Sequence, residues 1–158
     1  MRMQWVLGGM LAVSLVATDA LAQHQAPNQQ PTTAPAPTVP GGEMSLGTVR
    51  IPRGVTADGK PLPAGSYQVR LTADTVKPDA VGISDQLERW AEFVQGGNVR
   101  GREVVTIVPQ DEIKMVVKDA PPASGRSRVQ MLRGNDYLRV WFNRGGNHYL
   151  IHLPVQTN

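Results

Sequence analysis

The 158-residue sequence contains no cysteine, which excludes disulfide bonds, a thiol nucleophile, a cysteine-ligated zinc site and a lipid-modified cysteine. It also lacks the motifs of several enzyme classes. There is no Gly-x-Ser-x-Gly, no His-Glu-x-x-His, no EF-hand spacing and no phosphate-binding glycine loop. We therefore expect a fold that its hydrophobic core alone holds together, without a cofactor. A non-catalytic protein is favoured over an enzyme.

The sequence also lacks a large excess of positive or negative charge. Sixteen Lys and Arg residues stand against 13 Asp and Glu residues, which gives a net charge of +3. Nucleic-acid binders are usually far more basic, so we expect no nucleic-acid partner. Histidine is scarce, and the two that lie in the predicted domain are His148 and His152. On a strand they would lie about 13 Å apart, too far to share a metal ion, so no metal site is predicted.

The first residues have the pattern of a secretory signal peptide. Arg2 precedes an apolar run over residues 6–17, which is short for a membrane span, and Ala20-Leu-Ala22 fits a cleavage site. We predict a signal peptide over 1–22, with an uncleaved N-terminal anchor as the alternative. No second long apolar run follows, so no stable membrane span is expected after cleavage. The expected location is periplasmic or extracellular.

Residues 23–43 are rich in Pro, Gln, Thr and Ala, with Val39 as their one large apolar residue. Such a segment buries too little surface to offset its ordering entropy, so we predict a disordered linker. It would be either a spacer that holds the domain away from a wall or partner, or a passive tail. The remaining residues, 44–158, are predicted to form a single domain.

Short alternating apolar patterns separated by turn residues run through this domain. The expected strands cover 45–51, a segment beginning near Tyr67, and 89–95, 98–108, 127–132, 137–143 and 148–155. Residues 111–118 are also predicted as a strand, with a single helical turn as the alternative. Inside the 98–108 strand, Gly101 indicates a bulge or a close backbone approach. The fold class is all-β: an antiparallel Greek-key β-sandwich of about seven or eight strands, with a small β-barrel as the alternative.

A rigid turn leads into the Tyr67 strand. Pro61 and Pro63 fix φ around Leu62, Gly65 permits a φ that other residues resist, and Tyr67 then starts the alternation. The run Pro61-Leu-Pro-Ala-Gly-Ser-Tyr67 resembles the tyrosine corner of secreted immunoglobulin-like and transthyretin-like β-sandwich modules. The resemblance implies that the Tyr67 hydroxyl bonds to upstream backbone, and it speaks to fold rather than function.

Basic and aromatic residues gather near the C-terminus. Five arginines fall within residues 126–144 against one acid, Asp136. Arg128, Tyr137, Arg139 and Trp141 are the candidate binding residues, because arginine beside aromatic rings suits an anionic glycan or an acidic protein. The simpler interpretation is that Trp141 belongs to the core and Arg139 caps it with its aliphatic stem packed down.

Two functions follow from these patterns. The first is an exported, non-catalytic binding or interaction module of the cell envelope, whose partner is an envelope protein or an anionic glycan. The alternative is an envelope hydrolase that acts on a glycan or peptide through a carboxylate pair drawn from Glu88, Glu92 and Glu103. A structural subunit that adds a strand at an exposed sheet edge stays open beside the first.

Overall fold

The computed structural model describes residues 40–76 and 87–157, and all of them belong to one compact unit, Ala36–Asn158. The predicted signal peptide and most of the predicted linker lie outside the described residues. The described chain is almost entirely antiparallel sheet, as predicted. Its strands are β1 (Met44–Ile51), β2 (Val55–Ala57), β3 (Lys60–Leu62), β4 (Gly65–Thr75), β5 (Glu88–Gln95), β6 (Asn98–Pro109), β7 (Ser127–Met131), β8 (Tyr137–Arg144) and β9 (Asn147–Pro154).

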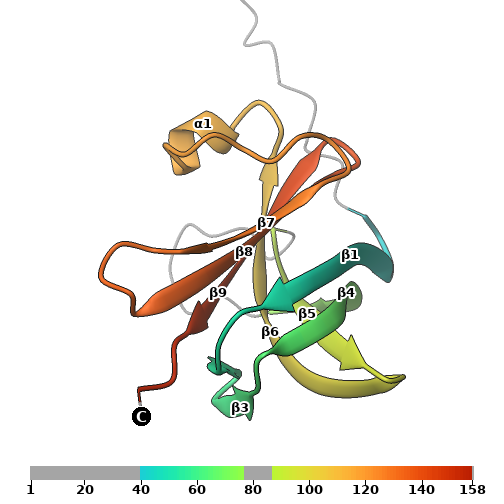
Figure 1. Ribbon diagram of the computed structural model, residues 1–158. Coiled ribbons are helices and arrows are strands. Elements are labelled where there is room, and N and C mark those ends of the chain that lie inside the picture. Colours follow the sequence, from blue (N-terminus) through green and yellow to red (C-terminus); the bar gives the residue numbers. More distant parts are fainter. Residues whose placement is uncertain (1–39, 77–86, 158) are drawn as a thin grey trace, which may run out of the picture. The chain divides into compact units, whose positions relative to one another are not determined.

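Seven strands form one sheet in the order β1-β4-β5-β6-β9-β8-β7 (Figure 1). The strands β7, β8 and β9 follow one another through hairpins, and β9 returns to pair with β6. A long connection from β6 to β7 therefore precedes three hairpin-linked strands, which is a Greek key. The predicted Greek-key topology is confirmed.

The sheet curls until its two ends meet. Strand β1 lies beside β7 and β8, although no ladder of backbone hydrogen bonds joins β1 to β7 in the described chain. A side chain bridges this seam instead, because Arg144 of β8 donates its Nε–H to the carbonyl oxygen of Leu46 in β1. The result is a nearly closed, barrel-like sheet, consistent with both the predicted sandwich and its barrel alternative.

The inward face of the sheet forms the main hydrophobic core. On β4, Tyr67, Val69 and Leu71 are buried while Gln68 and Arg70 point outward, as the alternation in the sequence predicts. Buried side chains of every other strand of the large sheet except the edge strand β7 join this cluster, and β7 adds partly buried residues. Each fully buried large apolar side chain stabilises the fold by roughly 1.5–3 kcal/mol.

The hairpin β5–β6 forms where it was predicted. Gly96 and Gly97 both have positive φ, 59° and 79°, in its two-residue turn. Further along, Phe93 pairs with Gly101 but Val94 pairs with Val99, so one extra residue bulges from β6. A Cβ on Gly101 would also lie 3.1 Å from that of Ala57, so the bulge and the close approach predicted there are both present.

A second, shorter hairpin was not predicted. The strands β2 and β3 pair through a turn at Asp58 and Gly59, whose φ values are 46° and 71°. No strands are predicted around this turn, because three-residue strands are too short to show an alternation. Their buried residues Val55, Ala57 and Leu62 join the main core, where β2 lies against β6 and β9 and β3 lies against β6.

The strand predicted over 111–118 is wrong, and the helical-turn alternative is correct. The helix α1 covers Ile113–Val116. Ile113 and Val117 are buried while Met115 is 79% exposed, which is a helical rather than a strand pattern. Ile113 and Val117 pack on the outer face of the sheet against Trp141, in a second small core. This tertiary contact, which a local pattern does not show, decides the helical conformation.

Candidate functional site

Trp141 is not part of an exposed binding surface. Its side chain is fully buried in the second core, on the outer face of β8 and beneath the segment that contains α1. Its Nε1–H donates to Nδ1 of His148 at 3.0 Å, and the two rings meet edge to face. The core interpretation of this residue is therefore the one that the structure bears out, because the segment after β6 folds back over the tryptophan.

Arg139 forms a hydrogen bond with His152 and an ion pair with Asp119. It donates its Nε–H to Nε2 of His152 at 3.0 Å, and its Nη1 lies 3.5 Å from Oδ2 of Asp119. Its guanidinium carbon lies 6.0 Å from the centroid of the Trp141 ring, and its side chain is 15% exposed. Burial, together with the positive charge of Arg139, lowers the pKa of His152. Arg139 caps the buried tryptophan, as the simpler interpretation predicted.

The two other candidate residues, Arg128 and Tyr137, are both exposed, and Arg128 has a side-chain hydrogen bond. Arg128 donates an Nη1–H to the carbonyl oxygen of Ala120 at 2.8 Å, and neighbouring Gln130 donates to Asp119 at 3.0 Å. Both bonds fasten the 119–120 segment to the outer face of β7. Tyr137 is 47% exposed and lies at the start of β8. Arg128 therefore helps to hold a loop in place, whereas the Tyr137 side chain is open to solvent.

Tyr67 forms the bond that a tyrosine corner implies. Its hydroxyl donates to the carbonyl oxygen of Pro63 at 2.7 Å, and its ring meets Phe93 edge to face. Gly65 differs from expectation, because its φ is not among the positive values. Space limits this position instead: a Cβ there would lie 3.0 Å from Nε2 of Gln95 and 3.6 Å from the Tyr67 ring.

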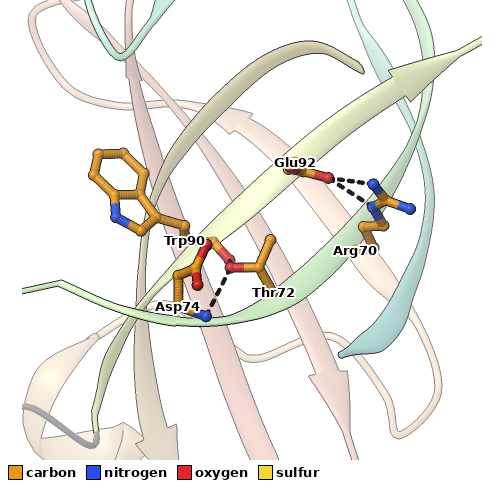
Figure 2. Close-up of polar contacts among 5 residues, drawn as sticks. All are labelled: Arg70, Thr72, Asp74, Trp90 and Glu92. Carbon is orange, nitrogen blue, oxygen red and sulfur yellow. Dashed lines mark hydrogen bonds and ion pairs between the residues drawn. The ribbon is translucent and has the colours of Figure 1, made fainter. Parts of the chain in front are cut away.

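A row of polar residues crosses the outer face of the other half of the sheet. The strand registers place Ser45 of β1 opposite Arg70 of β4, Arg70 opposite Glu92 of β5, and Glu92 opposite Arg102 of β6. Arg70 contacts Oε2 of Glu92 through Nε at 2.7 Å and Nη2 at 2.6 Å (Figure 2). Arg102 instead contacts Oδ2 of Asp58 at 3.1 Å. The row thus alternates positive and negative charge.

An irregular stretch of β4 lies beside this row. The register between β4 and β5 shifts after Leu71, and the Thr72 hydroxyl donates to the carbonyl oxygen of Trp90 at 3.0 Å. The same hydroxyl accepts the Asp74 N–H at 3.3 Å (Figure 2). Trp90 is half-buried, and the Arg102 guanidinium lies 4.3 Å from its ring centroid. This cation–π contact holds Arg102 over the sheet.

A groove of about 360 Å³ opens at the end of the row where β1 begins. Glu43, Ser45, Gln68, Arg70 and Val94 are among its lining residues. It lies where the register of β1 shifts between Ser45 and Gly47. The groove therefore offers a carboxylate, a guanidinium, an amide and a hydroxyl around an apolar patch.

The segment that enters β1 is fixed to the domain by Arg89. This side chain is 4% exposed, and it donates to the carbonyl oxygens of Pro40, Gly42 and Thr72. No carboxylate in the described residues forms an ion pair with it. Because Gly42 is held in this way, the adjacent Glu43 is positioned at the groove.

The acids proposed for a hydrolase do not converge. Glu92 is occupied by Arg70, and Glu103 accepts from the backbone N–H groups of Asp58 and Val104. Glu88 lies opposite Thr106 in the sheet. The groove itself contains one carboxylate, that of Glu43. None of the three acids Glu88, Glu92 and Glu103 lines the groove.

The two histidines are also held by separate partners. His148 accepts from Trp141 and is fully buried, which lowers its pKa, whereas His152 accepts from Arg139. Among the described residues there is no group of three or more His, Asp or Glu side chains that could hold a metal ion. The same part of the chain contains no helix long and apolar enough to cross a membrane.

Sequence reasoning missed the groove residues. The alternation that begins at Tyr67 puts Gln68 and Arg70 on the opposite face of the strand, but nothing in the pattern distinguishes them from ordinary solvated side chains. Glu43 stands at the end of the predicted linker, where no local signal indicates a fixed position. Its placement depends on Arg89, which lies 46 residues later in the sequence.

No protein-family model matches the chain, and neither a curated protein nor a solved structure matches it.

Proposed function

We propose that this protein is an exported, non-catalytic binding module of the cell envelope, and that it holds a segment of a partner protein in the groove at the start of β1. The observation that carries the proposal is the groove itself. Its volume of about 360 Å³ lies at the low end of the range of small-molecule sites, roughly 300–1,000 Å³, so it has room for one or two side chains of a partner segment. It joins donors and acceptors with an apolar patch, as ligand sites usually do.

The groove chemistry suits an extended polypeptide. Peptide groups present both N–H donors and C=O acceptors, and the groove has acceptors and donors that can bond to them. Glu43 accepts, Arg70 donates, and Gln68 does both. Val94 supplies apolar contact to a side chain of the partner. Because Arg70 is already held by Glu92, little conformational entropy is lost when it binds.

The export part of the proposal rests on the N-terminal pattern, and the class of module rests on the fold. The signal peptide predicted over 1–22 and the linker predicted over 23–43 would display the domain in the envelope. The spacer would enter the domain at the segment that Arg89 holds, next to the groove. The Greek key and the Tyr67–Pro63 hydrogen bond support an immunoglobulin-like module.

The test is to express tagged protein in its own host, crosslink lightly and identify what co-purifies. Gln68→Trp fills the groove with a large side chain from an outward position, so it should abolish recovery of the main partner. Ser124→Trp is the matched control, because Ser124 lies in an exposed loop away from the groove. Thermal unfolding of both variants checks that each remains folded.

Unchanged recovery with folded Gln68→Trp would refute the groove as the binding site. Recovery of no protein, combined with a rise in melting temperature on adding an anionic glycan, would replace the protein partner by a glycan. Release of sugar or peptide fragments by the purified protein would favour the hydrolase alternative.

A further inference from the structure

A second, smaller cleft lies at the opposite end of the polar row. Its volume is about 160 Å³, and it is lined by the turn of the β2–β3 hairpin and by the first residues of β6. Gly101 explains why it forms, because the missing Cβ lets the hairpin approach to within 3.1 Å of where that atom would be. The bulge at Arg100 then places this arginine beside the hairpin turn.

The cleft has an excess of positive charge. Lys60, Arg100 and Arg102 line it together with one carboxylate, that of Asp58. Asp58 is already neutralised, because Arg102 donates its Nε–H to Oδ2 at 3.1 Å. The backbone N–H of Asp58 donates to Oε2 of Glu103 at 2.8 Å. Two cations, Lys60 and Arg100, remain without an ion pair among the residues that the structure describes.

The two free cations differ in what they offer a ligand. A guanidinium presents a planar fork of donors that matches a carboxylate, sulfate or phosphate group, and an ammonium group adds a point charge. Both Lys60 and Arg100 are exposed, so they reach a ligand without first being uncovered. The cleft is smaller than most sites for whole organic ligands, which exceed roughly 300 Å³, so it fits a single charged group.

We propose that this cleft binds an oxyanion group, a carboxylate, sulfate or phosphate, between Lys60 and Arg100. Arg102, held by Asp58 and by the Trp90 ring, forms its wall. The site goes beyond the proposed function. It shares none of its lining residues with the groove, and the row from Ser45 to Arg102 spans three strand spacings, about 14 Å.

The experiment is an NMR titration of the ¹⁵N-labelled protein purified from its own host. Sodium sulfate, phosphate and acetate are added in separate arms at constant ionic strength, so that general screening does not change. We expect saturable shifts of the amides of residues 58–60 and 99–102. The anion that saturates at the lowest concentration identifies which oxyanion the cleft prefers.

Paired variants make the result specific. Lys60→Gln with Arg100→Gln should weaken the apparent affinity by about tenfold or more, since both charge-assisted bonds are lost. Arg53→Gln with Arg133→Gln removes the same charge from exposed positions outside the cleft and should leave the affinity unchanged. Gln68→Trp, which fills the groove, should also leave it unchanged, so this site and the groove can fail independently.

Two outcomes would overturn the proposal. The first is a set of shifts that grow linearly with each anion and spread over all the basic residues. The second is saturable binding that survives in the Lys60→Gln, Arg100→Gln protein while that protein keeps its fold. Either result would show that the cleft attracts anions no more than any other basic surface does.

Discussion

The Nε1–H of Trp141 donates to Nδ1 of His148 at 3.0 Å, and both side chains are fully buried on the outer face of the sheet. A nitrogen that accepts this bond carries no proton, so the proton of neutral His148 lies on Nε2. Among the residues that the structure describes, that Nε2 atom has no hydrogen-bond partner. Protonating the ring would therefore break the bond with Trp141 and place an unpaired charge in the second core.

Stability should consequently depend on the two histidines below neutral pH. Burial lowers the pKa of His148, and burial with Arg139 lowers that of His152. Below about pH 6.5 the two imidazoles bind protons more readily in the unfolded chain than in the folded chain. The free energy of unfolding therefore decreases as the pH falls. Above that pH both forms are neutral and the contribution is constant.

Urea unfolding at pH 7.5, 6.5 and 5.5 measures this dependence. His152→Gln keeps an acceptor for Arg139 but does not titrate, so its stability should fall less over the same interval. Equal slopes for the variant and the natural sequence would show that His152 makes no contribution to the pH dependence.

Replacing Tyr67 by Phe should destabilise the domain by about 1 kcal/mol, because a partly buried hydrogen bond to Pro63 is lost. Tyr137→Phe is the matched control, since Tyr137 is 47% exposed and should change stability by less than about 0.5 kcal/mol. Chemical unfolding of both variants provides the comparison. Similar values for the two would mean that the tyrosine corner does not stabilise this fold.

Gly101→Ala should destabilise the domain by about 1–3 kcal/mol, because its Cβ would meet that of Ala57 at 3.1 Å and push the β2–β3 hairpin outward. Ala57→Gly removes the opposing atom, so the double variant should be more stable than the two single effects predict. Gly41→Ala, whose Cβ would meet no atom of the described residues within 4 Å, controls for the change of residue type. Strict additivity would refute the steric explanation.

Arg144→Ala should loosen the seam between β1 and β8. The variant loses the bond from Nε to the Leu46 carbonyl, and we expect a destabilisation of about 1–2 kcal/mol. Amide hydrogen exchange should accelerate in β1 more than in β5, which is paired on both sides. Arg126→Ala, at an exposed position, should leave both measurements unchanged. Uniform exchange in the Arg144 variant would indicate that other contacts close the seam.

Local patterns in the sequence determined most of the strands. Tyr67, Val69 and Leu71 alternate with polar residues, and such an alternation has one stable solution, with the apolar set facing a core. Paired glycines such as Gly96 and Gly97 adopt the positive φ that a two-residue hairpin turn needs. These features depend on near neighbours alone, so the all-β class could be predicted from them, whereas the Greek key was an expectation from the tyrosine-corner resemblance.

The tertiary structure decided what covers each outward face. The alternation in β8 places Arg139 and Trp141 together, but the sequence does not show that α1 and the segment after it fold over the tryptophan. The placement of Glu43 by Arg89 likewise joins residues that are 46 positions apart. Burial and binding surfaces arise from contacts between distant segments, whereas periodicity reports only which way a side chain points.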